Sequence, residues 1–380
     1  MKDYSLLNLI TLANTFGAGS SNGFKVFEKI NSSGLLNAEI KNIATKIEFS
    51  DAVKSKLISA KYDRAEKIIE TCKEHKINIL KITDSIYPDS LKNISVPPLV
   101  LYYKGIFPDF NTLPSITIVG PRKCTDYGKK AAFSLGYRLS RAGMIVVSGG
   151  AKGCDAAAHK GVLSAKGITA LLLGCGILCN YLPENKPLRE EVAKSGCLIS
   201  EYPPLSRPSR ISFPIRNRIM SGLTLGTVVV EGREGSGAII TAKAAAEEGR
   251  DVFVIPGNPS VNEYKGSNNL LREGAKPLLD CSDIFGEYLP SYPEYLDIER
   301  AYSKKDQVKT KKEIKKYQKN LKETLSNEAK IVYNYLDKQI FSIDDLSATN
   351  LSSDLILSAL TELELENLIE PVVGGQYKIK

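Results

Sequence analysis

The 380-residue chain is 43% hydrophobic and 25% charged and carries a net charge of +8, a composition ordinary for a globular protein. It contains no apolar run near the roughly 20 residues of a membrane helix, and its amino terminus lacks the basic start and cleavage site of a signal peptide. Its seven cysteines form no CxxC pair and only two histidines accompany them, which argues against a disulfide framework and a zinc site. We therefore expect a cytoplasmic protein with reduced thiols and with no metal ion, cofactor or membrane contact.

Residues 1–109 are expected to form a small helical domain. An apolar stretch from Leu6 to Leu12 is followed by the glycine-containing turn Phe16–Gly19 and by Phe24 and Phe27. Short helices around a glycine-rich turn resemble a helix-hairpin-helix or sterile-alpha-motif-like module, which can hold the DNA backbone through turn amides. The loop is only loosely of that type, so a purely packing role is at least as well supported.

Residues 110–284 are expected to form an α/β core. Short apolar runs alternate there with stretches of helical composition, and the candidate strands are Ile116–Val119, Met144–Val147, Ala170–Leu173, Cys197–Ser200, Thr227–Val230 and Val252–Ile255. Continuous apolar runs without polar alternation indicate strands that are covered on both faces. The pattern therefore predicts a doubly wound, extended Rossmann-like parallel sheet.

Residues 285–326 are predicted to be a linker, and its second part is rich in lysine. Between residues 303 and 322 nine lysines stand against Asp306 and Glu313. This Lys-rich linker is expected to be solvated, with nonspecific binding of a nucleic-acid strand as the alternative.

Residues 327–380 are predicted to be a winged-helix module, with helices near 327–338, 343–348 and 352–366 and a β-hairpin over Ile369–Ile379. Residues 323–380 hold four lysines and ten acids, and the third helix has no lysine or arginine. A recognition helix in the major groove meets phosphates on both sides and normally carries positive charge. We therefore expect a protein-contact or autoinhibitory role for this module.

Three glycine-containing turns follow predicted strands at what should be one edge of the sheet. Ligands of open parallel sheets sit beyond the carboxyl ends of the strands, where glycines allow close approach and helix N-termini attract anions. No GxxxxGK[ST] or GxGxxG string occurs, which disfavours the usual ATP cradle and dinucleotide binding. The predicted contacts in these turns are Gly120, Ser148, Gly149, Gly150, Ser236 and Gly237, although Ser148–Gly150 can also be a tight turn of purely structural use.

Basic and aromatic residues are interleaved around the same turns. The expected contacts are Arg122, Lys123, Lys152, Lys186, Phe213, Arg216, Asn217 and Arg218, with Tyr127, Tyr181 and Tyr202 among them. Cations along a groove, together with rings on which bases stack, favour binding of single-stranded nucleic acid without sequence preference. The alternative for each arginine is a structural partnership with Glu201 or Glu231, at the ends of the fourth and fifth predicted strands.

Candidates for catalysis are weak. Asp155 and His159 share a helix face, but this spacing is also that of a routine cap and an ordinary helical histidine. Glu201 and Glu231 could form a carboxylate pair acting on a glycosidic bond, yet nothing in the sequence sets their separation. No serine or cysteine has a recognisable base partner, so we do not expect an enzyme.

A series of motifs in unbroken order makes residues 115–280 similar to the DNA-processing protein A (DprA/Smf) family. The matching strings are Ile118–Arg122, Ser148–His159, Ser200–Pro204, Phe213–Gly222, Ser236–Ala242, Gly249–Gly257 and Gly266–Ala275, with weaker similarity at Tyr87–Lys92 and Pro97–Gly105. The resemblance implies an extended Rossmann-like fold that binds single-stranded DNA, dimerises and loads RecA during natural transformation. It places the key DNA-binding arginine at Arg122.

Three positions depart from the family pattern. Leu178 and Leu182 stand where family members commonly have Asp and Pro, and Pro187 stands where a basic residue often helps to bind DNA. Neighbouring Lys186 is the candidate substitute for that contact.

The expected function is that of a non-catalytic single-stranded DNA-binding mediator, which protects incoming DNA and hands it to RecA, and acts as a homodimer. The alternative from another class is a nucleotide-ligand enzyme or sensor related to cytokinin-activating phosphoribohydrolases. That group uses a PGGxGT-type loop, which the nearest string here, Pro256-Gly-Asn-Pro259, does not match. A sequence-specific repressor acting through the winged helix is weakened by the acidic third helix.

Overall fold

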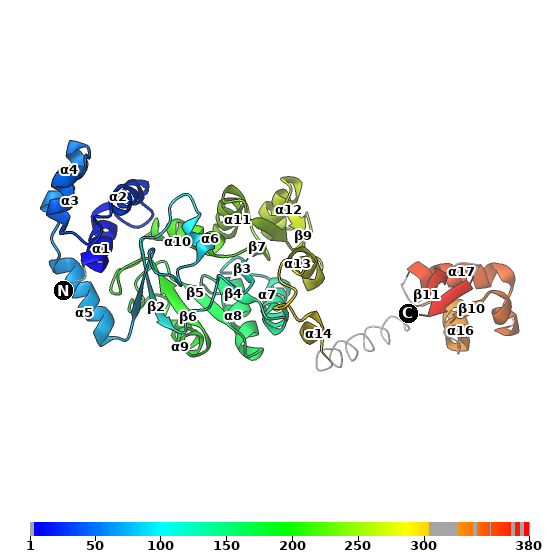
Figure 1. Ribbon diagram of the computed structural model, residues 1–380. Coiled ribbons are helices and arrows are strands. Elements are labelled where there is room, and N and C mark those ends of the chain that lie inside the picture. Colours follow the sequence, from blue (N-terminus) through cyan, green and yellow to red (C-terminus); the bar gives the residue numbers. More distant parts are fainter. Residues whose placement is uncertain are drawn as a thin grey trace. The chain divides into compact units, whose positions relative to one another are not determined.

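The computed structural model describes residues 4–303, 325–336, 340–349, 351–365, 369–372 and 376–379. The chain divides into two compact units, Met1–Ala301 and Tyr302–Lys380 (Figure 1). The predicted lysine-rich stretch lies outside the described residues from residue 304 to its end at residue 322. In the part of the chain that is described, no helix is both long enough and apolar enough to cross a bilayer.

The amino-terminal region is helical, as predicted. It contains α1 (Tyr4–Phe16), α2 (Ser21–Ser32), α3 (Ile40–Lys46), α4 (Asp51–Ser59) and α5 (Asp63–Glu74). The buried Asn8 amide joins these helices to their connections, because it donates to the carbonyls of Leu36 and Ala38 at 2.7 and 2.8 Å and accepts from the Tyr62 hydroxyl at 2.7 Å. A buried polar group with all these partners fixes how the helices pack.

The centre of the first unit is a nine-stranded sheet in the order β1-β2-β6-β5-β4-β3-β7-β8-β9. Its strands are β1 (Asn78–Lys81), β2 (Val100–Gly105), β3 (Ser115–Val119), β4 (Ile145–Ser148), β5 (Thr169–Leu172), β6 (Cys197–Ser200), β7 (Gly226–Val229), β8 (Asp251–Val254) and β9 (Lys276–Pro277). Neighbours from β6 to β9 are parallel. The six predicted strands are confirmed, each within one residue, and with them the predicted parallel α/β sheet.

Helices cover both faces of this sheet. Figure 1 shows α8 (Cys154–Ser164) and α9 (Lys186–Ser195) on one face, and α10 (Ser212–Leu223) and α11 (Gly237–Glu247) on the other. Long α7 (Asp126–Arg141) packs beside α8. The chain runs from β3 towards β6 on one side and resumes at β7 on the other, so the strand order reverses between β3 and β7. In doubly wound sheets this switch point is the usual place for a ligand.

Two predicted domain boundaries differ from the structure. β1 and β2 fall within the predicted helical domain 1–109, yet β2 pairs antiparallel with β6 and extends the sheet. The predicted linker begins at 285, yet α13 (Cys281–Tyr288) and α14 (Ile298–Ala301) belong to the first unit, where Leu296 is buried and Asp297 N–H donates to the Ala142 carbonyl at 2.9 Å. Both differences arise because short segments pair with residues far away in the sequence: β2 pairs with β6, and the segment around Asp297 bonds to Ala142.

The second unit is the predicted winged helix. It consists of α16 (Asn327–Tyr335), β10 (Ile340–Ser342), the 3-10 helix η3 (Asp344–Thr349), α17 (Ser353–Leu365), β11 (Ile369–Val372) and β12 (Gln376–Ile379). Its sheet has the order β10-β12-β11. Phe341, Leu360 and Leu363 lie in a small apolar core of its own. The short strand β10 was not predicted, since three residues carry too little pattern to be seen in a sequence.

Candidate nucleic-acid interface

The three predicted glycine turns lie side by side at one edge of the sheet. They follow β4, β3 and β7, which are consecutive neighbours in the parallel sheet. We call this edge the strand-end rim and define it as the turns 120–125, 149–153 and 230–236. The first two turns are in contact, because the Cys154 N–H donates to the Pro121 carbonyl at 3.4 Å. The rim therefore brings together residues more than 100 positions apart.

Arg122 is the most prominent exposed cation of the rim. Its guanidinium lies over the ring of Phe213, 5.5 Å from the centroid, and the Phe213 ring is 5.4 Å from that of Tyr181. A guanidinium held on a ring face is positioned without losing its hydrogen-bond donors to another protein group. Lys123 beside it is also exposed. Both residues are thus placed as the sequence predicted, at the surface of the first turn.

Arg122 and both rings line a small crevice of about 20 Å³ together with Gly149, Gly150, Asn185, Arg189 and Arg216. Asn185 and Arg189 were not predicted. Asn185 donates to the Gly150 carbonyl at 2.9 Å, and Arg189 donates to the Tyr181 carbonyl at 2.8 Å, so each supports a group that faces the crevice. The sequence offered one indication of Asn185 and Arg189: both lie close to the predicted contact Lys186, after the turn that follows β5.

Arg216 differs from its predicted role as an exposed contact. It is only 7% exposed, and its guanidinium donates to the carbonyls of Gly149 (2.9 Å) and Leu172 and to the Asn217 side chain (3.1 Å). Burial lowers the pKa of Arg216, whereas the nearby Asp155 carboxylate raises it. Asn217 is buried as well. Arg216 thus holds the backbone of the second turn from within, and the Asn217 amide donates to the Gly237 carbonyl at 3.5 Å, at the start of α11.

Arg218 is also a structural residue. Its guanidinium donates to both carboxylate oxygens of Glu201 at 2.6 and 2.7 Å and to the Val96 carbonyl at 2.7 Å. Glu201 further accepts from the Gly19 N–H at 3.1 Å, which ties the helical region to the sheet. Burial raises the pKa of Glu201, and Arg218 opposes that shift. The partnership with Glu201, considered as the alternative, is the arrangement observed.

The second turn presents glycine backbone and Lys152 rather than Ser148. The Ser148 hydroxyl is buried and donates to the Ile118 carbonyl at 2.7 Å, so it cannot meet a ligand as predicted. Gly150 adopts a φ of +66°, a left-handed conformation that glycine tolerates. The exposed Lys152 ammonium lies 2.5 Å from the Glu184 carboxylate, which offsets part of its charge.

Lys186 and the third turn are open to solvent. The Lys186 side chain is 67% exposed and has only a loose ion pair with Glu190 at 4.0 Å. Ser236 is the N-cap of α11, and its buried hydroxyl oxygen has no hydrogen-bond partner among the described residues. Gly237 is exposed, with open space around it. Lys186 and Gly237 remain candidates for contact with an anion.

The candidates for acid–base chemistry are enclosed. His159 is fully buried and its Nδ1 lies 2.8 Å from the Thr169 hydroxyl; burial lowers its pKa to about 3, so it is neutral. Glu201 is engaged by Arg218, and Glu231 is completely buried. The rim thus presents no accessible pair of carboxylates among the described residues.

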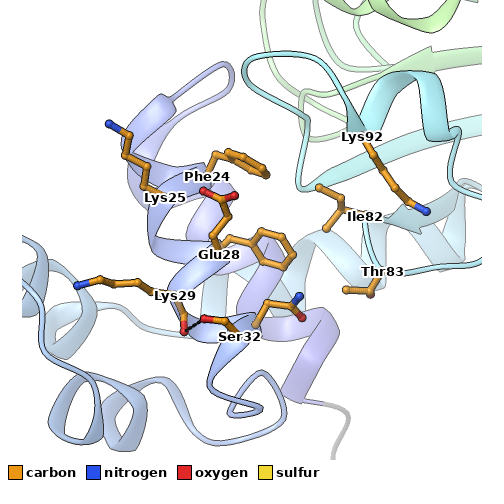
Figure 2. Close-up of a pocket in the computed structure, with 10 residues that line it drawn as sticks. Phe24, Lys25, Glu28, Lys29, Ser32, Ile82, Thr83 and Lys92 are labelled. Carbon is orange, nitrogen blue, oxygen red and sulfur yellow. Dashed lines mark hydrogen bonds between the residues drawn. The ribbon is translucent and has the colours of Figure 1, made fainter.

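A larger cavity, of about 1010 Å³, lies away from the rim. It lies between α2 and the segment after β1, where Phe24 points towards Ile82 (Figure 2), and Phe27, Thr83 and Lys92 also line it. Two of its lysines already have partners, since Lys29 donates to the Glu48 carbonyl and Lys92 to Asp89. Size alone therefore does not identify the functional site.

Comparison with protein families supplies the observation that decides the identity. Residues 78–289 match the model described as DNA recombination-mediator protein A, and residues 318–375 match the DprA winged helix domain. The chain belongs to the DprA/Smf family. The predicted resemblance is thereby confirmed, and with it the general role of the family in DNA processing and recombination.

Individual relatives agree with this placement. The DNA processing protein DprA of Bacillus subtilis is 36% identical over 252 residues, which cover 66% of this chain and 85% of that protein. The crystal structure of DprA from Streptococcus pneumoniae has a TM-score of 0.65 and 31% identity, and covers 76% of this chain and 98% of that one. A DprA structure from Helicobacter pylori, described as giving insight into a single-stranded DNA binding mode, has a TM-score of 0.52 and 28% identity, with coverages of 57% and 97%.

The departures from the DprA/Smf pattern lie around the crevice. Leu182 has a φ of +51°, which a proline ring cannot adopt. Pro187 occupies the first turn of α9, where the lack of an N–H costs nothing. Lys186, at the start of the same helix, is the exposed cation nearest in sequence to the missing basic residue.

Proposed function

We propose that this DprA/Smf chain binds single-stranded DNA across the strand-end rim, cleaves no bond in it, and delivers it to the RecA recombinase during natural transformation. The observation that carries the proposal is the Arg122 guanidinium on the Phe213 ring with Tyr181 beside it. A cation next to two aromatic rings suits the phosphate and the base of one nucleotide. The DNA bound by the Helicobacter pylori relative supports the same ligand class.

The proposed contacts divide into two groups. Direct contacts with DNA are assigned to the exposed residues Arg122, Lys123, Lys152, Lys186 and Gly237 and to the half-buried ring of Phe213. Supporting roles are assigned to residues that are enclosed by, or already bonded to, other parts of the protein: Gly120, Ser148, Gly149, Gly150, Arg216, Asn217, Arg218 and Ser236. Truncating a supporting residue should lower stability before it lowers affinity.

A binding role without catalysis is favoured over nucleotide hydrolysis. His159 is neutral and buried, and Glu201 and Glu231 are enclosed, so none of these three acid–base candidates is accessible to a substrate at the rim. Protection of incoming DNA, homodimer formation and RecA loading are proposed on the basis of family membership. Release of free base from nucleoside monophosphates by the purified protein would contradict the non-catalytic role.

The test is the affinity for a fluorescent thymidine oligomer measured over a range of salt concentrations. Arg122→Ala should weaken binding at least tenfold, about 1.4 kcal/mol, and lower the slope of log K against log salt by about 0.7 for each lost phosphate contact. Lys194→Ala is the matched control, since Lys194 is an exposed cation at the carboxyl end of α9, away from the rim. Equal affinities of the Arg122 and Lys194 variants would remove Arg122 from the site.

A further inference from the structure

The buried carboxylate of Glu231 lies where a phosphate would be expected in a nucleotide-binding protein of this architecture. It follows β7 and faces the β3–α7 turn, at the point where the strand order reverses. The Thr125 N–H donates to one of its oxygens at 3.1 Å, while the Thr125 hydroxyl donates to the other. The Tyr264 hydroxyl donates to that second oxygen at 3.1 Å. Three donors from two further elements thus converge on one anion.

This carboxylate is positioned over the first turn of α7. Thr125 is the N-cap of that 16-residue helix, and its hydroxyl accepts from the Gly128 N–H at 3.0 Å. A Cβ added at Gly128 would run into the Glu231 carboxylate, so the carboxylate lies directly against the helix. The amino end of a long helix carries partial positive charge and attracts anions. Within the described residues no lysine or arginine forms an ion pair with Glu231.

The neighbouring turn repeats the arrangement. The buried Asp155 carboxylate, at the start of α8, accepts from the Ala151 N–H at 3.3 Å and also from backbone at Gly149. Two of the three turns of the rim are therefore closed by carboxylates of the chain itself. The third differs, because the N-cap Ser236 makes no side-chain capping bond and Gly237 is surrounded by open space.

We propose that Glu231 is a specificity-determining residue, which occupies the anion site of the β3–α7 turn and so keeps free phosphate and mononucleotides out of the rim. This inference rests on the proposed binding of DNA at the same rim. A single phosphate finds the anion site of the β3–α7 turn occupied and can contact only one or two exposed groups of the rim, such as Arg122 and Lys123. A polynucleotide does not need this site, because it contacts several exposed cations at once and each contact adds to its affinity.

The experiment removes the Glu231 carboxylate and tests whether orthophosphate binds in its place. The full chain, Glu231→Ala and Glu231→Ser are dialysed against labelled orthophosphate at constant ionic strength, and thermal unfolding is followed at increasing phosphate. Each emptied variant should bind orthophosphate at least about tenfold more tightly than the parent chain, because three donors and a helix terminus lose their internal acceptor. Glu231→Gln is the matched control: it removes the same buried negative charge but keeps the space beside the α7 terminus filled by an amide of nearly the same size.

The outcomes separate this inference from the proposed function. Orthophosphate binding by Glu231→Ala and Glu231→Ser, or folding of these variants that is rescued by phosphate, supports the inference, provided that Glu231→Gln binds phosphate no better than the parent. Folded Ala and Ser variants that bind phosphate no better than the parent overturn it, as do Ala and Ser variants that stay unfolded at every phosphate concentration. The affinity of Arg122→Ala for thymidine oligomer is measured in parallel, so a failure of DNA binding at the rim is recognised independently.

Discussion

Lowering the pH should destabilise this protein through a single buried side chain, His159. The Thr169 hydroxyl donates to the Val146 carbonyl at 2.8 Å, so the Nδ1 of His159, 2.8 Å from the same hydroxyl, must donate to it. Burial lowers the pKa of this ring from 6.5 to about 3, so the folded protein keeps it neutral near neutral pH. In the unfolded chain His159 becomes protonated below pH 6.5, whereas in the folded chain it becomes protonated only near pH 3. The folded state thus loses stability as the pH falls through that window.

The size of the effect follows from the two pKa values. Each pH unit within the window is equivalent to about 1.4 kcal/mol, so His159 alone should cost about 2 kcal/mol between pH 7 and pH 5. The assay is urea unfolding at both pH values, followed by circular dichroism. His159→Asn is the reference, because its amide keeps a donor near Thr169 but does not titrate. An equal pH-dependent loss in the parent and the variant would refute the reasoning.

Two further predictions concern residues that resemble DNA contacts in the sequence. Arg218→Ala should lower the free energy of unfolding by about 3–5 kcal/mol, because it leaves the buried Glu201 carboxylate without its cation. Replacing Arg218 by Met and Glu201 by Leu together should recover most of that loss. Below its unfolding temperature, Arg218→Ala should bind thymidine oligomer within about threefold of the parent; a tenfold loss would assign Arg218 to the interface. Deletion of 327–380 should leave duplex affinity unchanged, because α17 carries no basic residue, and a large loss in a gel-shift assay would contradict the protein-contact role.

The exposed surface of α17 is consistent with a protein contact. Leu355 and Leu357 are 43% and 46% exposed on this helix, and Asp354 and Glu364 add negative charge to its exposed positions. Phosphates repel such a surface, whereas an oppositely charged protein surface with apolar patches complements it. The winged-helix fold alone therefore does not imply that this module reads DNA.

The sequence by itself determined the sheet, the edge of the sheet where a ligand is expected and the exposed position of Arg122 at that edge. Buried parallel strands need continuous apolar runs, and the turns that follow them need glycine, so both are visible as local patterns. Arg122 follows such a turn directly, and its place at the surface was predicted for that reason. The strand-end rim is therefore largely a property of short segments.

Only the tertiary structure decided which polar groups face solvent. Arg216 and Arg218 stand two positions apart and look alike in the sequence, but one bonds to the Leu172 carbonyl and the other to Glu201. The same holds for Ser148, which is satisfied by a carbonyl on a neighbouring strand, and for Glu231, which is enclosed by Thr125 and Tyr264. The partners named here lie 17 to 106 positions away from these groups along the chain, and no local pattern encodes such pairings.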